Sequence, residues 1–298
     1  MGGGAVRILA PAKINLGLAV LGRRDDGYHE ILTIFQAVSL CDRLTVRRAR
    51  EGVRVRCPAL PDLGADNLAH RAAALFLERT GGSGGVEIEI EKRIPAGGGL
   101  GGGSSDAAAT LLGCCRLFAV RPKRHELHEW AARLGSDVPF FLEGGAAVGS
   151  GRGETIEAIE PWAGRATALI HIPPEGLATA TVYGRFRNGG LTPRGRAFTI
   201  LKARWREGDL RRLGAALFND LEPAAFGLFP RLAEVKDALL GAGAAGALLC
   251  GSGSSVVGLF GEPAAAGAAG RALSGRFPGR FVRAHFVAGR KRWGVVKR

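Results

Sequence analysis

A glycine-rich segment is the strongest chemical signal in the chain. Six of the seven residues 97–103 are glycine, and Ser104 and Ser105 follow directly. The segment lies between an alternating strand pattern and an Ala/Leu-rich helical pattern, so its backbone N–H groups and a helix dipole converge on one point. Glycines also allow positive φ angles and a close approach of backbone to ligand. The segment therefore predicts a cradle for an anion, suited to the phosphates of a nucleotide.

The glycine spacing fits no common nucleotide-binding loop in full. Gly97-x-Gly99-x-x-Gly102 satisfies the dinucleotide-binding pattern, but that pattern needs an acidic residue about 20 positions later. The charged residues in that region, at 116–124, are all cations. The Gly-Lys-Ser/Thr sequence of a P-loop occurs nowhere in the chain. A flexible linker is the remaining alternative, and the tight placement between a strand and a helix disfavours it.

Four other sites carry reactive side chains, and taken alone each has a simpler structural explanation. Asp137 lies in Gly135-Ser-Asp-Val-Pro-Phe-Phe141, which favours a turn at a helix end. Lys13 could be a surface cation. Asp106 could contact Mg²⁺, but the helix dipole already explains an acid at that place. His125 and His128 are three positions apart rather than four, so we expect a solvated helix face there and no metal site.

Hydrophobic periodicity predicts the elements that must position these residues. The first half mixes strands and helices without regular βα alternation, which favours an α+β fold, and the second half is richer in helix. The predicted strands are at 5–20 around Pro11, at 31–40, as a half-exposed hairpin at 44–55, at 86–91, and as short strands near the C-terminus. The predicted helices are at 66–79, from the glycines to about 118, at 125–134, at 196–217 and at 230–240. Polar or glycine turns are expected at 22–27 and 251–255.

Length and charge limit the possible classes of protein. At 298 residues the chain is long enough for two domains. Its net charge of +14 suggests a polyanionic partner, but residues 271–298 hold nine cations and no acid. A basic end of this kind is usually solvated. We therefore expect no dedicated nucleic-acid partner, although a polyanion-binding module remains the alternative from another class.

The cysteines and the hydropathy pattern indicate the cellular compartment in which we expect the protein. The five cysteines are an odd number without a C-x-x-C pair, which favours free thiols in a reducing compartment. The first residues lack a signal-peptide pattern, so we expect a cytoplasmic protein. The uncharged stretch 238–261 has the length of a membrane span, but its glycines and short apolar blocks indicate buried elements joined by a turn. No membrane association is expected.

Three ordered segments resemble the motifs of the GHMP small-molecule kinases. They are Pro11-Ala-Lys-Ile-Asn-Leu16, Pro95-Ala-Gly-Gly-Gly-Leu-Gly-Gly-Gly-Ser-Ser105 and Leu249-Cys-Gly-Ser-Gly-Ser254. Two more segments, Gly22–Glu30 with Phe35-Gln36 and Gly135–Phe141, are similar to members whose substrate carries a cytidine diphosphate group. The resemblance spans residues 5–260. Cys250 departs from it, because that position more often holds Ser or Thr, but it adjoins the glycine turn rather than forming it.

The resemblance implies a two-domain α+β architecture with the active site in the cleft between the domains. The N-terminal domain would span residues 1–160 and contain the ATP loop, and the C-terminal domain would span 161–298. It also implies an ATP- and Mg²⁺-dependent kinase that phosphorylates a hydroxyl of a small molecule by direct in-line transfer. A kinase for homoserine or mevalonate is the nearest alternative. We expect a monomer or weak homodimer.

The resemblance further implies roles for individual residues. Asp137 would be the catalytic base, with Lys13 beside it. Asn15, Tyr28, His29 and Tyr183 would bind the substrate, with the aromatic rings stacking on cytosine and the imidazole bonding its edge. By residue type alone, Tyr183 could be core. The ATP-binding residues would be Pro95, Ala96, Gly97, Gly98, Gly99, Leu100, Gly101, Gly102, Gly103, Ser104 and Ser105, with Lys92 and Asn67 near the adenine. No protein ligand is assigned to a metal.

Overall fold

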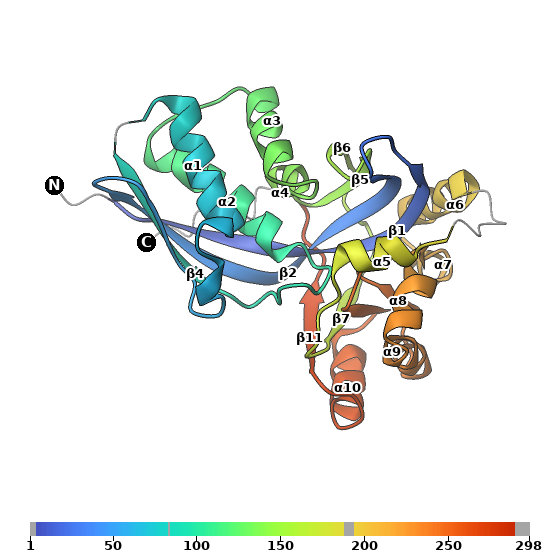
Figure 1. Ribbon diagram of the computed structural model, residues 1–298. Helices are drawn as coiled ribbons and strands as arrows, with labels where there is room; N and C mark the ends of the chain where they lie inside the picture. Colours follow the sequence, from blue (N-terminus) through green and yellow to red (C-terminus); the bar gives the residue numbers. More distant parts are fainter. Residues whose placement is uncertain (1–3, 83, 188–193, 290–298) are drawn as a thin grey trace.

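The computed structural model describes residues 4–82, 84–187 and 194–289, and two β-sheets form its framework (Figure 1). The larger sheet has the order β3-β4-β2-β1-β8, with β5 pairing β2 and β6 pairing β5. Its strands are β1 (Val6–Arg23), β2 (His29–Ala49), β3 (Val53–Arg56), β4 (Gly85–Glu91), β5 (Ala146–Ser150), β6 (Thr155–Ile159) and β8 (Phe218–Asn219).

The two longest strands, β1 and β2, form an antiparallel hairpin closed by the predicted polar turn. Pro11 was expected to separate two strands, but β1 is continuous and its register with β2 shifts between Pro11 and Ala12. Proline has no N–H to give to a ladder, and a local irregularity of this kind accommodates it. A second shift, between Asn15 and Gly17, lies in the middle of the strand.

The predicted hairpin at 44–55 is wrong. β2 continues to Ala49, and β3 pairs in parallel with β4, which lies between β3 and β2. The alternation of residues 44–55 shows which face of a strand is buried, but it does not show which strand is its partner. The predicted strand at 86–91 is confirmed as β4, with alternate buried side chains at Val86, Ile88 and Ile90.

Helices cover one face of the larger sheet (Figure 1). They are the 3₁₀ turn η1 (Pro61–Asp66), α1 (Leu68–Thr80), α2 (Gly102–Leu117), α3 (Arg124–Leu134) and α4 (Val138–Glu143). α1 ends as predicted at Gly81, which has a φ of 59° and donates its N–H to Leu77. α2 packs closely on the sheet because it presents small residues. A Cβ on Gly113 would lie 2.9 Å from Val46.

The smaller sheet has the order β11-β7-β10-β9 and is antiparallel throughout. Its strands are β7 (Thr167–Ile172), β9 (Gly246–Leu249), β10 (Val256–Phe260) and β11 (Arg280–His285). The helices of this half are α5 (Thr179–Arg185), α6 (Arg194–Glu207), α7 (Leu210–Ala215), α8 (Glu222–Leu228), α9 (Arg231–Gly241) and α10 (Pro263–Ser274).

Two predictions for this half can be checked directly. The single helix expected at 196–217 is two helices, because Gly208 has a φ of 71° and Asp209 caps α7 with its side chain. The stretch 238–261 consists of the end of α9, then β9, a glycine turn and β10, which confirms buried elements joined by a turn. Among the described residues, no helix combines the length and apolar character that a membrane crossing requires.

Candidate active site

A cavity of about 1060 Å³ opens between the two halves of the chain. From the first half it is lined by the glycine segment, by Lys13 and Asn15 of β1, and by Asp137. From the second half it is lined by α5 and by the turn at Gly251 and Ser252. Segments far apart in the sequence thus converge on one space, as the predicted cleft requires.

The glycine segment is held in place by the turn that joins β9 and β10. Its carbonyl groups are used for docking: Gly97 accepts from the N–H of Ser254, and Gly98 accepts from that of Ser255. A Cβ on Gly99 would lie 1.9 Å from the carbonyl oxygen of Cys250, so only glycine fits there.

The same segment opens α2 at the cavity. Gly101 caps the helix with a φ of 71°, and the first N–H groups of α2 have no partner within the helix. Residues 95–104 all line the cavity. The geometry is therefore that of an anion cradle at a helix N-terminus.

Lys13 and Asp137 lie together on the cavity wall. Their Nζ and Oδ2 atoms are 3.5 Å apart. Lys13 is 5% exposed in the middle of β1, and its backbone N–H donates to the carbonyl of Leu100 in the glycine segment. Asp137 precedes α4 and makes no capping bond to it, and its side chain is 27% exposed. The Asp137 carboxylate thus makes no capping bond, opens to the cavity and lies beside a buried ammonium. Such a carboxylate can accept a proton from a bound hydroxyl.

The rings of Tyr28, His29 and Tyr183 all line the cavity. His29, at the start of β2, contacts Tyr183 of α5, with ring centroids 4.9 Å apart and planes inclined by 31°. Tyr28 is 57% exposed, and the guanidinium of Arg152 lies 4.8 Å from its ring centroid. The structure thus brings together the three residues that were expected to bind a base.

The electrostatics of these rings favour neutral forms. Burial and the charge of Arg23 lower the pKa of His29, so its imidazole is neutral near pH 7 and offers one donor and one acceptor. Burial, with a smaller effect of the Asp137 charge, raises the pKa of Tyr183 well above its usual value. The phenol of Tyr183 therefore stays protonated and can donate a hydrogen bond.

Cations dominate the charged part of the cavity wall. The wall contains four cations, which are Lys13, Arg23, Arg152 and Arg187. Among its described residues, Asp137 alone is acidic. Sequence reasoning did not single out Arg152 or Arg187 as site residues. The chain has 41 Lys and Arg residues, and nothing in the local sequence separates these two from the rest.

Lys92 does not line the cavity itself, but a Cβ on the cavity-lining Gly102 would lie 3.2 Å from its Nζ atom. Its ammonium lies 2.5 Å from Asp42 and 2.8 Å from Asp106, and its side chain is 7% exposed. Its charge also acts on the thiol of Cys57, which it helps to ionise. The predicted approach of Lys92 to adenine stays a prediction. Ser105 is 1% exposed and does not line the cavity, so its predicted contact with ATP also stays a prediction.

Asp106 needs a different explanation from the one expected. It is the fifth residue of α2, beyond the first turn, and its partner is Lys92 rather than the helix dipole. Burial raises its pKa to about 7. Asp106 and Lys92 therefore anchor the start of α2 to β2 through Asp42.

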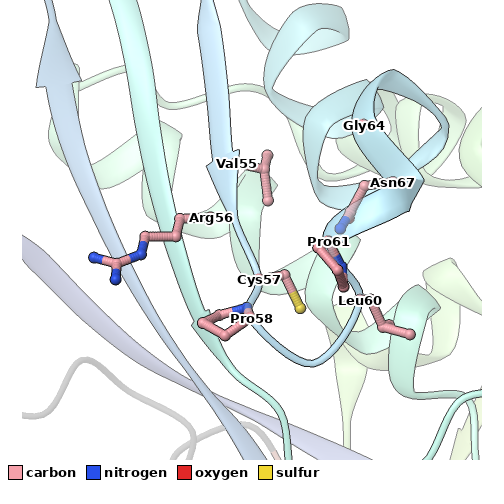
Figure 2. Close-up of a pocket in the computed structure, with 8 residues that line it drawn as sticks. All are labelled: Val55, Arg56, Cys57, Pro58, Leu60, Pro61, Gly64 and Asn67. Carbon is pink, nitrogen blue, oxygen red and sulfur yellow. The ribbon is translucent and has the colours of Figure 1, made fainter.

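A second cavity, of about 370 Å³, is lined by residues between 55 and 67 (Figure 2). Asn67 lines this second cavity, and the next residue, Leu68, lines the first. Asn67 also caps α1, because its side-chain oxygen accepts from the N–H of Ala69. Figure 2 shows Leu60, Pro61 and Cys57 grouped around the opening and the Arg56 side chain turned away from it. This small, largely apolar pocket lies close to the glycine segment, because a Cβ on Gly103 would lie 3.5 Å from Leu68.

Comparison with known families supports this architecture. Residues 67–145 match the GHMP kinases N-terminal domain, and residues 201–279 match the GHMP kinases C-terminal domain. The chain belongs to the GHMP kinase family, and the predicted α+β fold with two domains is confirmed. The exact division at residue 160 stays a prediction.

Within this family, the chain can be compared with individual kinases. The chain is 45% identical to the 4-diphosphocytidyl-2-C-methyl-D-erythritol kinase of Moorella thermoacetica, over 84% of this chain and 88% of that protein. A crystal structure of 4-(cytidine 5′-diphospho)-2C-methyl-D-erythritol kinase matches with a TM-score of 0.80 and 39% identity, over 95% of this chain and 100% of that one. Homoserine kinase from Cytophaga hutchinsonii has a TM-score of 0.77 at 21% identity, over 98% of this chain and 97% of that one, a likeness of fold alone.

Proposed function

We propose that this chain transfers the γ-phosphoryl group of ATP to the 2-hydroxyl of 4-diphosphocytidyl-2-C-methyl-D-erythritol, a step of the non-mevalonate route to isoprenoid precursors. The observation that carries the proposal is the single cavity in which a phosphate cradle, the Lys13–Asp137 pair and a cluster of aromatic rings meet. The identity of over 40% to kinases of this name, along most of both chains, supports the substrate.

ATP would place its phosphates on the glycine segment and its base in the second cavity. The first N–H groups of α2 would bind the phosphate oxygens. The second cavity begins at Asn67, directly beside the cradle, and its Leu and Pro side chains suit the faces of a purine. Both residues expected near adenine keep that proposed role, because Asn67 lines the second cavity and the charge of Lys92 acts on Cys57 of the same wall.

Asp137 would accept the proton of the 2-hydroxyl while its oxygen attacks the γ-phosphorus. The bond from that phosphorus to the β-γ bridging oxygen breaks in line, and ADP leaves. Lys13 holds the Asp137 carboxylate in place by its charge and faces the entering hydroxyl. Protein charge and positioning thus supply the catalysis, and the proposal includes no phospho-enzyme.

Mg²⁺ belongs to the proposal as the counterion of ATP. Magnesium prefers oxygen ligands and is often held by phosphates with only one or two protein groups. The cavity wall fits this requirement, because it offers the hydroxyl of Ser104 at the start of α2, where the phosphates would lie. Bound there, the ion would neutralise negative charge on the transferring phosphates.

The nucleotide part of the substrate would occupy the part of the cavity that is lined by Tyr28, His29 and Tyr183. Tyr28 and Tyr183 would stack on cytosine, and neutral His29 would bond its edge. Asn15 lines the deeper wall near Lys13, where the polyol would lie. Arg23, Arg152 and Arg187 would balance the charge of the diphosphate between these two parts.

The setting of the enzyme is also inferred. The five free cysteines fit a reducing compartment, and we infer a cytoplasmic location. We propose a monomer or weak homodimer whose partners are ATP and this small molecule, without a dedicated nucleic-acid partner. The last residues of the basic end, 290–298, lie outside the described residues.

An ADP-release assay tests the proposal. The protein is supplied with ATP and Mg²⁺ and with one of four acceptors: 4-diphosphocytidyl-2-C-methyl-D-erythritol, homoserine, mevalonate or galactose. A reaction without acceptor measures background hydrolysis. We expect the first acceptor to give the highest kcat/KM, and preference for any of the other three would overturn the substrate assignment.

A further inference from the structure

We propose that Thr33 is a positioning residue of the phosphoryl-transfer site. Its hydroxyl fixes the orientation of the Asn15 carboxamide, and through that group it fixes the ammonium of Lys13. The inference rests on the proposed function, because it takes Lys13 as the group beside the reacting hydroxyl. Thr33 itself does not line the cavity.

A chain of three hydrogen bonds connects Lys13 to the sheet. Lys13 Nζ donates to Asn15 Oδ1 at 2.8 Å. Asn15 Nδ2 donates to Thr33 Oγ1 at 2.8 Å. Thr33 Oγ1 donates in turn to the carbonyl oxygen of Gly17 at 2.7 Å. These hydrogen bonds connect the ammonium of Lys13 to the backbone of the same strand, β1.

The direction of each bond is fixed by the chemistry of the two ends. An ammonium only donates, so Asn15 must turn its oxygen towards Lys13. A backbone carbonyl only accepts, so the single hydrogen of the Thr33 hydroxyl is committed to Gly17. The Thr33 oxygen is then left as an acceptor and selects the NH₂ end of Asn15. Both ends of the chain therefore impose the same orientation on the carboxamide.

Burial makes this orientation costly to lose. Thr33 is fully buried, and Asn15 is 1% exposed. An amide group that loses a partner in such a place has little access to water as a replacement. Thr33 is also held firmly, because β2 pairs with β1 on one side and with β5 on the other. The register shift between Asn15 and Gly17 interrupts the ladder at the point where Gly17 accepts the hydroxyl.

Two matched substitutions test the proposal. Thr33→Val keeps the shape but removes the hydroxyl, whereas Thr33→Ser keeps the hydroxyl. We expect Thr33→Val to lower kcat about 10- to 100-fold, the scale of a misplaced catalytic group. KM for ATP should hardly change, since the phosphate cradle is built from backbone groups. Thr33→Ser should retain a kcat close to that of the wild type.

A double variant distinguishes a positioning role of Thr33 from a general loss of structure. If Thr33 acts through Asn15, adding Thr33→Val to Asn15→Ala should cause no further fall in kcat, because residues in one network are not additive. Thermal midpoints identify the folded variants. If Thr33→Val does not fold, the pair Thr33→Ala and Thr33→Ser makes the same comparison without the γ-methyl group.

The outcomes distinguish this inference from the function on which it rests. A wild-type kcat in Thr33→Val, an equal loss in both backgrounds, or an equal loss in the Ser variant would overturn the role of Thr33 alone. A wild-type protein that phosphorylates none of the four acceptors would overturn the proposed function, and this inference with it. An active wild type, a slow Val variant and a restored Ser variant support both.

Discussion

At the scale of single residues, the site depends on which polar groups face the cavity and which are already committed. Asp137 faces it with no capping bond, whereas Asp106 and Asp42 are both committed to Lys92. Lys13 is held by Asn15 and lies beside Asp137. This division of partners leaves one carboxylate and one ammonium at the proposed point of transfer.

Tyr28 offers a test of base stacking that leaves the core intact. Its ring is 57% exposed, so its removal should hardly change the thermal midpoint. Stacking on a base contributes about 1–3 kcal/mol, and Tyr28→Ala should therefore raise KM for the substrate roughly 10- to 100-fold. Tyr28→Phe keeps the ring and serves as the matched control. An unchanged KM in the Ala variant would remove Tyr28 from the binding site.

His29 should contribute selectivity rather than affinity alone. Its neutral imidazole can bond the edge of a base, and a site built for a hydrogen bond rejects a mismatched partner strongly. We expect His29→Ala to reduce the ratio of kcat/KM between the cytidine substrate and its uridine analogue. A lower thermal midpoint with an unchanged ratio would show that His29 only packs against Tyr183.

At the scale of elements, the glycine segment has to satisfy two neighbours at once. The β9–β10 turn packs against the glycine segment, and Phe141 of α4 also contacts it. Gly101 is the point where both backbone angle and space are restricted, with a φ of 71° and a Cβ position 2.8 Å from Phe141.

Gly101→Val should consequently weaken ATP binding more than substrate binding, because a β-branched residue opposes the positive φ and displaces the start of α2. Titration calorimetry with each ligand measures the two affinities. Gly227→Val, at a helical glycine with open space around it, is the control. If ATP affinity survives while substrate affinity falls, the wrong ligand has been placed on this loop.

Asp106, which is buried at the start of α2, should make the stability of the fold depend on pH. Its pKa is about 7 in the fold against 3.8 for an ordinary aspartate, so the folded state binds the proton more tightly. The resulting stabilisation is complete below pH 3.8 and is lost as pH rises through about 7. Relative to wild type, Asp106→Asn should therefore gain thermal stability as pH rises across this range. A constant difference in midpoint would contradict the shift, and Asp25→Asn, at an exposed aspartate, is the control.

The sequence predicted local features of these elements better than their partners. The start of α2 at the glycine segment and the end of α1 at Gly81 depend on glycine chemistry within a few residues, and both were predicted correctly. The pairing of β3 with β4 joins residues that are 33 positions apart in the chain, which periodicity does not encode. For the same reason the predicted strand at 31–40 did not single out Thr33, because the bonds of Thr33 to Asn15 and Gly17 cross between strands.

At the scale of the whole molecule, the two halves meet at the proposed point of transfer. β8 comes from the second half but pairs with β1 of the larger sheet. From β8, the buried Asn219 donates to the carbonyls of Leu249 and Gly251. A Cβ on Gly251 would lie 3.2 Å from Lys13 Nζ. The position of the smaller sheet is thus coupled to the reacting groups of the larger one, and no single segment of sequence contains this site.

The central claim is that Asp137 acts as the base in a phosphoryl transfer within this cavity. The most direct test follows the γ-phosphoryl group of labelled ATP into 4-diphosphocytidyl-2-C-methyl-D-erythritol with the wild type and with Asp137→Asn. A positioned base contributes about 10²- to 10⁴-fold to rate, so we expect kcat to fall by that factor while ATP affinity and the thermal midpoint stay close to those of the wild type. Transfer of label at the wild-type rate by a folded Asp137→Asn protein would contradict the account.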